Sequence, residues 1–169
     1  YIASELTPQR VQLSKQVTLY ASQSNPGARE AADKLSGAVA NIRVTDTIDG
    51  SDGKKPTHFL LYLSAKTFTG KERQLLTKEL WDYATWKTKK VEADRRGGAR
   101  LPVVMVHEND PELDGCEFAL FFKSTPKALI DDGLYYAQAM SLHPGHFLPV
   151  SLAIVAPALN APAETSRSE

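Results

Sequence analysis

Glu79 has the side chain whose type and setting most favour chemistry in this sequence. An unbroken apolar run at residues 59–63 precedes it, too short for a helix and typical of a strand buried on both faces. In the helical pattern that follows, Leu76, Leu80 and Tyr83 recur on one face, and Glu79 falls inside that apolar arc. Open α/β sheets place their sites beyond the carboxyl ends of such strands, where Glu79 is expected to lie. The simpler alternative is that Glu79 only reaches solvent from the border of the helix.

A predicted turn between a strand at residues 16–21 and the next helix collects small polar residues. They are Ser22, Ser24, Asn25 and Gly27. Free backbone N–H groups in such a turn can hold a phosphate group. The spacing is not the GxGxxG pattern, however, and Asn25 as a helix cap before Pro26 explains the turn without a ligand. Ser64, directly after the run 59–63, either faces the same crevice or is an ordinary turn residue.

The other reactive side chains do not indicate a cysteine or metal centre. Cys116 with His107 could form a nucleophile pair, but a lone cysteine beside a phenylalanine-rich run is typical of a core. His143 and His146 are close in sequence, yet no cysteine partner or HExxH pattern accompanies them. We therefore expect no metal site and no required cofactor.

Predicted strands and helices alternate along the chain. Further strands are expected at residues 41–45 and 101–107, and further helices at residues 126–130 and 150–159. Residues 134–142 fit either a strand or a helix, and we interpret them as a strand with flanking residues. This alternation predicts an α/β fold, a three-layer α/β/α sandwich with a mostly parallel five-stranded sheet. Residues 46–55 are polar and aperiodic, which predicts a surface loop.

The 169 residues suit a single domain with a full-sized core. We expect a leading segment at residues 1–15, one domain at residues 16–160, and a disordered Pro/Ala/Ser tail at residues 161–169. The chain begins with a tyrosine rather than a methionine, so we expect it to be part of a longer protein.

Charge and composition restrict the partners. Twenty basic residues balance twenty acidic ones, which argues against nucleic-acid binding, and no apolar run approaches the ~20 residues that would insert in a membrane. One cysteine and no signal peptide predict a cytoplasmic or intracellular location. The signs are segregated, since residues 87–100 are mostly basic and residues 108–117 are acidic. Such segregation favours head-to-tail association of the chain with itself, and the alternative is that both segments are ordinary solvated loops.

The stretch YLSAKTFTGKERQLLTKELWDYA resembles the third strand, turn and third helix of Toll/interleukin-1 receptor (TIR) domains. In that family a strand ends in serine, here Ser64, and the helix carries a Glu-Leu pair, here Glu79 and Leu80. The element order over residues 16–160 is similar to that family's flavodoxin-like domain. The phrases SNPGARE, FLLYLSAKTF, VVMVHEND, GCEF and GLY are similar to a TIR-like module of large algal and protist multidomain proteins. The turn before Glu79 is longer than usual in the family and lacks its tryptophan-cysteine pair.

The resemblance implies two functions. The first is an intracellular signalling module that assembles with itself or with related TIR-like domains as part of a larger multidomain chain. The second is an enzyme that cleaves the nicotinamide–ribose bond of NAD, with Glu79 catalytic and a crevice formed by residues 22–27 and Ser64. A third possibility, independent of the family, is a flavodoxin-like domain that binds a small ligand, although the clustered aspartates of a phospho-acceptor domain are missing.

Overall fold

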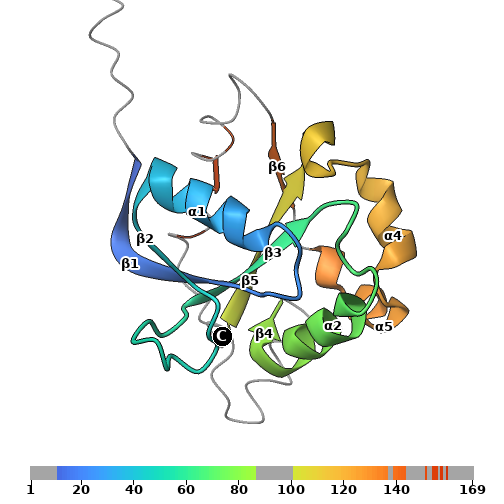
Figure 1. Cartoon of the computed structure of the whole chain (residues 1–169), viewed down its shortest axis with the longest axis horizontal. Helices are drawn as coiled ribbons and strands as arrows, with labels where there is room; N and C mark the ends of the chain where they lie inside the picture. The colour runs from blue at the N-terminus through green and yellow to red at the C-terminus, as the bar shows by residue number, and fades with distance from the viewer. Residues whose placement is uncertain are drawn as a thin grey trace, which may run out of the picture.

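The central sheet is parallel at every strand pair that the structure describes (Figure 1). The computed structural model describes residues 11–86, 101–136, 139–143, 151, 154, 155, 157 and 159. The strand order is β2-β1-β3-β5, with the short strands β6 and β4 both beside β5. The strands are β1 (Val11–Ala21), β2 (Val39–Thr45), β3 (His58–Leu63), β4 (Ala84–Thr85), β5 (Leu101–Glu108) and β6 (Met140–Leu142). With β6 as the fifth strand, this is the order of a flavodoxin-like fold.

Strand β3 lies at the centre of the sheet, between β1 and β5. Its residues 59–63 are at most 5 % exposed, which confirms the prediction made from the unbroken apolar run. The apolar residues 101–106 predict the same burial for β5, and this is only partly right, since residues 104–106 are buried but residues 101–103 are half-exposed. Among the described residues, only the two-residue β4 pairs with the amino end of β5 on that edge, so this end is less covered.

Helices cover both faces of the sheet, which confirms the three-layer sandwich (Figure 1). Helix α1 (Ala28–Ala38) packs on one face, together with the described residues of 151–159, which are helical. Helices α2 (Glu72–Tyr83), α4 (Phe121–Ser124) and α5 (Lys127–Asp131) pack on the other face. We call these the α1 face and the α2 face. Short 3-10 turns lie at Pro111–Leu113, Phe118–Leu120 and Leu134–Tyr136.

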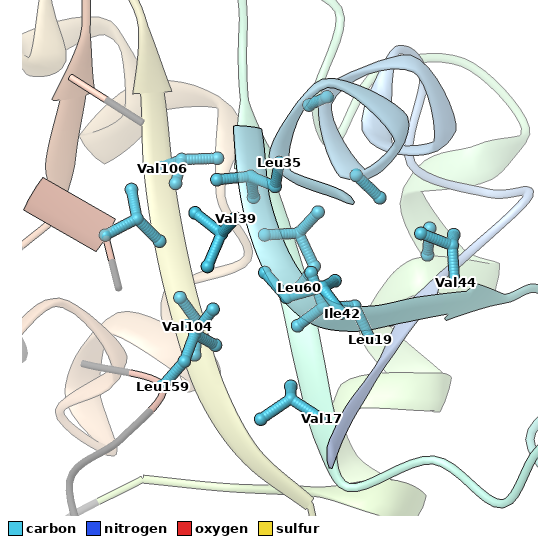
Figure 2. Close-up of a cluster of buried hydrophobic side chains, with 14 of the residues drawn as sticks. Val17, Leu19, Leu35, Val39, Ile42, Val44, Leu60, Val104, Val106 and Leu159 are labelled. Atoms are coloured by element: carbon cyan, nitrogen blue, oxygen red, sulfur yellow. The ribbon is translucent and has the colours of Figure 1, made fainter. Parts of the chain in front are cut away.

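The core of the α1 face joins segments that are far apart in the sequence (Figure 2). Leu35 of α1 and Leu159 belong to one buried cluster with Leu60 of β3 and Val104 of β5, and Leu159 lies beside Val104. Leu35 and Leu60 are fully buried, and Leu159 is 3 % exposed. The predicted apolar helix at residues 150–159 is thus confirmed at the residues described there, and it closes the α1 face.

Several predicted boundaries differ from the structure. Strand β1 begins at Val11 rather than residue 16, because a register shift between Gln12 and Val17 lets it pair with β2 at both ends. The predicted strand at residues 134–142 shrinks to β6 after the 3-10 turn at Leu134–Tyr136. Tyr83 is 41 % exposed instead of facing the core, since α2 ends there and Ala84 takes the buried position.

Strands β2 and β3 are joined by residues 46–57, which contain no helix or strand, as predicted for this polar segment. Ile48 from this connection packs against the core of the α2 face, so the loop covers part of that face. Among the residues described, no helix has the length and apolar character needed to cross a membrane. The predicted basic segment at residues 87–100 and the predicted tail at residues 161–169 lie outside the described residues.

Candidate functional site

Strand geometry distributes the predicted site residues between the two faces of the sheet. Successive side chains of a strand point to opposite faces, so residues two apart share a face. Tyr20 packs in the core of the α2 face, and Ser22 therefore points to that face. Tyr62 packs in the core of the α1 face, and Ser64 follows it there. The single predicted crevice containing both serines is not what the structure has.

The first group of residues joins the end of β1 to α2. The Ser22 hydroxyl donates a hydrogen bond to the Glu79 carboxylate, although the two residues are 57 positions apart. Ser22 is 2 % exposed, and its oxygen also accepts the Ser24 N–H at 3.0 Å. Glu79 is half-buried, so its carboxylate is oriented but remains in reach of solvent. Burial, and secondly the negative charge of Glu79, raise the pKa of Tyr20 beside this pair.

Two apolar side chains flank Glu79 on the same stripe of α2. Leu75 and Tyr83 lie four positions before and after it, a spacing that places all three side chains on one face of the helix. Leu75 is 55 % exposed and Tyr83 is 41 % exposed. The carboxylate therefore lies between two apolar groups that nothing in the described part of the chain covers fully.

Asn25 has a structural role in the turn between β1 and α1. Its amide donates to the Tyr62 carbonyl at 2.8 Å and accepts the Tyr62 N–H at 2.9 Å, which fastens the turn to β3. The prediction that Asn25 caps α1 was wrong. Gly27 is the N-cap residue, without a side-chain cap, because the Asn25 side chain is used by β3. Ser24 is also buried, so two of the polar side chains predicted to surround a phosphate belong to the turn itself.

Ser64 lies in a second turn, directly after β3. Its N–H donates to the Thr67 hydroxyl at 2.9 Å, and that hydroxyl donates to the Tyr62 carbonyl at 2.8 Å. The Ser64 hydroxyl accepts the Lys66 N–H at 3.3 Å. Ser64 is 2 % exposed, and both it and Gly27 line a cavity on the α1 face. That cavity does not include Glu79 or Ser22 in its lining.

The cavity has a volume of about 280 Å³ and lies between the start of α1 and the ends of β3 and β5. On its wall the Tyr62 hydroxyl donates to Glu108 at 2.7 Å. The other oxygen of Glu108 accepts the N–H groups of Asn109 and Asp110 at 3.1 and 3.0 Å. Burial, and secondly the hydrogen bond to Glu108, raise the pKa of Tyr62, so the phenol keeps its proton and remains the donor.

Residue type and spacing do not single out Tyr62 or Glu108. Tyr62 is one more member of the apolar run 59–63, and a charged residue such as Glu108 is common where a strand ends. Glu108 is in fact 4 % exposed, so it does not belong to an exposed acidic surface. The alternation of side chains along the strands could have identified this pair. Tyr62 pairs in register with Val106, and Glu108 lies two residues further along β5, so its side chain points to the same face of the sheet as Tyr62.

The remaining candidates have structural explanations. His107 is 8 % exposed, contacts the Cys116 carbonyl through Nε2, and packs edge-on against Phe118 and Phe121. Burial raises the pKa of the Cys116 thiol, which opposes a role as a nucleophile. Among the described residues, no group of histidine, cysteine or acidic side chains has the geometry of a metal site. His146 lies outside the described residues.

No protein-family model matches this chain, and neither does any curated protein or solved structure.

Proposed function

We propose that this chain is an NAD⁺ glycohydrolase of the TIR-like type, with Glu79 as its catalytic residue. The observation that supports the proposal is the hydrogen bond from Ser22 to Glu79. Both residues were singled out from the sequence, and they meet at the carboxyl end of β1, where parallel α/β sheets place their ligands. The NAD specificity comes from the resemblance to TIR domains and remains a prediction.

In the proposed reaction, the bond between C1′ of the ribose and the nicotinamide nitrogen breaks. Nicotinamide leaves with the bonding electrons, and water adds to C1′ and loses a proton, so the products are nicotinamide, ADP-ribose and a proton. The sugar carries positive charge in the transition state, as in other glycoside cleavages. A carboxylate near the ribose can bind its hydroxyl groups and stabilise that charge.

Ser22 acts as a positioning residue in this proposal. Its hydroxyl occupies one lone pair of the Glu79 carboxylate, which fixes the side chain and leaves other lone pairs for the ribose. Leu75 and Tyr83 supply apolar surface on both sides of the carboxylate, suited to an aromatic ring or to a second copy of the chain. In TIR-type sites a neighbouring subunit often completes the site, so activity is expected to rise steeply with protein concentration.

The test is the release of nicotinamide by purified protein at high concentration. We expect Glu79→Gln to lower release by about 100-fold or more, because the charge at the transition state loses its partner. Ser22→Ala should lower it by about tenfold, the effect of one hydrogen bond to a charged group. Glu72→Gln is the matched control, since Glu72 lies in the first turn of the same helix. Full activity in a folded Glu79→Gln variant would remove this residue from the mechanism.

A second candidate function is the interaction module, in which association itself is the activity. The specific observation in its favour is the exposure of Leu75 and Tyr83 on one stripe of α2. We expect Leu75→Glu to weaken self-association in sedimentation experiments, because it places a charge in an apolar contact. Ile154→Glu is the control, since Ile154 is 58 % exposed on the opposite side of the sheet.

The dependence of association on salt separates two kinds of contact. Attraction between the charged segments would fade between ~0.1 M and ~1 M salt, because the Debye length falls from about 10 Å to about 3 Å. An apolar contact through Leu75 and Tyr83 would persist. If the chain stays monomeric at high concentration in both low and high salt, neither the charged contact nor the apolar contact drives self-association.

A further inference from the structure

The cavity on the α1 face is a second site, separate from Glu79. Its volume of about 280 Å³ is close to twice that of the engineered cavities of about 150 Å³ that bind benzene. Part of its lining is apolar, from Ala31, Leu113 and Leu142. The ring of Tyr62 lies against Gly27, where a Cβ atom would come within 2.5 Å of it. The cavity therefore suits a small organic molecule with an apolar body.

Glu108 is the buried charged group on the cavity wall. It is 4 % exposed, and its three hydrogen-bond partners, the Tyr62 hydroxyl and two backbone N–H groups, are all donors. All three partners donate to the carboxylate, and none of them carries a positive charge. Its two oxygens accept about four hydrogen bonds in total, so one position remains free.

No cation within the described residues neutralises Glu108. The ion pairs described there are Arg29 with Asp33 and Lys66 with Asp114. A buried carboxylate without a positive partner is costly, and a cationic ligand would relieve that cost. The unpaired charge, rather than the number of acids nearby, is therefore the feature that points to a ligand.

The charges at the cavity mouth favour the same sign of ligand. Four acidic residues and two lysines line the cavity: Glu30, Glu108, Glu112, Asp114, Lys34 and Lys66. Lys66 is engaged by Asp114 at 3.2 Å, and Glu30 in the first turn of α1 offsets the positive end of that helix. The net field at the entrance is negative and attracts a cation.

We propose that this cavity binds a small organic cation, a primary amine with an apolar body, whose ammonium group lies against Glu108. Tyr62 fixes the carboxylate and forms the floor under the apolar part. The site is independent of the proposed NAD chemistry, because it lies on the other face of the sheet and uses none of the same side chains.

Three probes with one carbon skeleton test the sign of the charge: 2-phenylethylammonium, 2-phenylethanol and phenylacetate. They are titrated into the whole chain while NMR follows the amide signals of Asn109 and Asp110, which donate to Glu108. We expect the ammonium probe to shift these signals in a saturable way, with a Kd of about 1 mM or lower. The neutral and anionic probes should bind at least about tenfold more weakly, the effect of one charge-assisted hydrogen bond.

Variants then locate the site. Glu108→Gln should weaken binding of the ammonium probe by about tenfold or more, whereas Glu117→Gln, which changes an exposed acid that does not line the cavity, should leave it nearly unchanged. Equal binding of all three probes by the wild-type chain, preference for phenylacetate, or the absence of saturable shifts would each overturn the proposal. These outcomes do not depend on whether Glu108→Gln folds.

The proposals for Glu79 and for the cavity can be tested independently of each other. Glu79→Gln should abolish nicotinamide release and leave binding of the ammonium probe intact. Loss of probe binding in a folded Glu79→Gln variant would show that the cavity is not an independent site.

Discussion

Gly27 is a residue at which one added methyl group should have a large effect on this fold. Its φ is +83°, in the left-handed region that side chains other than glycine's rarely adopt. A Cβ atom at this position would also lie 2.5 Å from Cε1 and 3.2 Å from Cδ1 of Tyr62. Gly27→Ala therefore combines backbone strain with a collision against a ring that is 5 % exposed and cannot move aside freely.

Two other glycines separate these contributions. Gly53 has a φ of +81° but open space around its Cβ position, so Gly53→Ala should cost only the strain, about 1–2 kcal/mol. Gly37 lies within α1, where a Cβ atom meets nothing within 4 Å, so Gly37→Ala should stabilise by about 0.5–1 kcal/mol. Gly27→Ala adds overpacking of about 1–3 kcal/mol to the strain, which gives a total of about 2–5 kcal/mol.

The assay is urea unfolding of the three variants, followed by a double mutant. Tyr62→Leu removes the ring atoms that the new methyl group meets, so Gly27→Ala in that background should cost only about 1–2 kcal/mol. The reasoning is refuted if Gly27→Ala costs no more than Gly53→Ala, or if Tyr62→Leu leaves the cost of Gly27→Ala unchanged. Either result would mean that the ring does not lie against Gly27 in solution.

Two further predictions concern the core and the pH dependence of stability. Leu61→Ala should cost about 2–5 kcal/mol, because Leu61 is fully buried and leaves a cavity, whereas Leu75→Ala at an exposed position should cost less than about 1 kcal/mol in the same unfolding assay. Burial lowers the pKa of His58 below its ordinary value of 6.5, so the unfolded chain binds the proton more readily than the folded chain does. The stabilisation from neutral His58 is fully present above pH 6.5 and declines as the pH falls through the lower folded pKa. Unfolding curves at about pH 7.5 and about pH 5 should thus differ less for His58→Gln than for the wild-type chain, and an equal difference would contradict the assignment.

The sequence was sufficient to predict the architecture, because a strand buried on both faces has an unbroken apolar run. Such a run can be recognised without knowing which strands lie beside it. The run 59–63 is too short for a helix and typical of a buried strand, and the alternation of such runs with helical stretches indicates a parallel sheet covered on both sides. It was insufficient where neighbours decide the outcome. Tyr83 has the right spacing for the core, but α2 ends at that residue and it stays exposed.

For the site residues, too, the sequence predicts some features and contacts between distant residues decide the others. Residue type and position at strand ends identified Ser22, Ser64 and Glu79 as candidates, and these are properties that a sequence carries locally. Only the tertiary structure decided which of them meet. In each strand the side chains alternate between the two faces of the sheet, and the sequence alone does not show which face a given residue takes. Ser22 turns towards α2 and reaches Glu79, whereas Ser64 turns towards α1 and joins the cavity of Tyr62 and Glu108. The phase of one strand relative to another is set by pairing register and helix packing, which act between residues far apart in the chain.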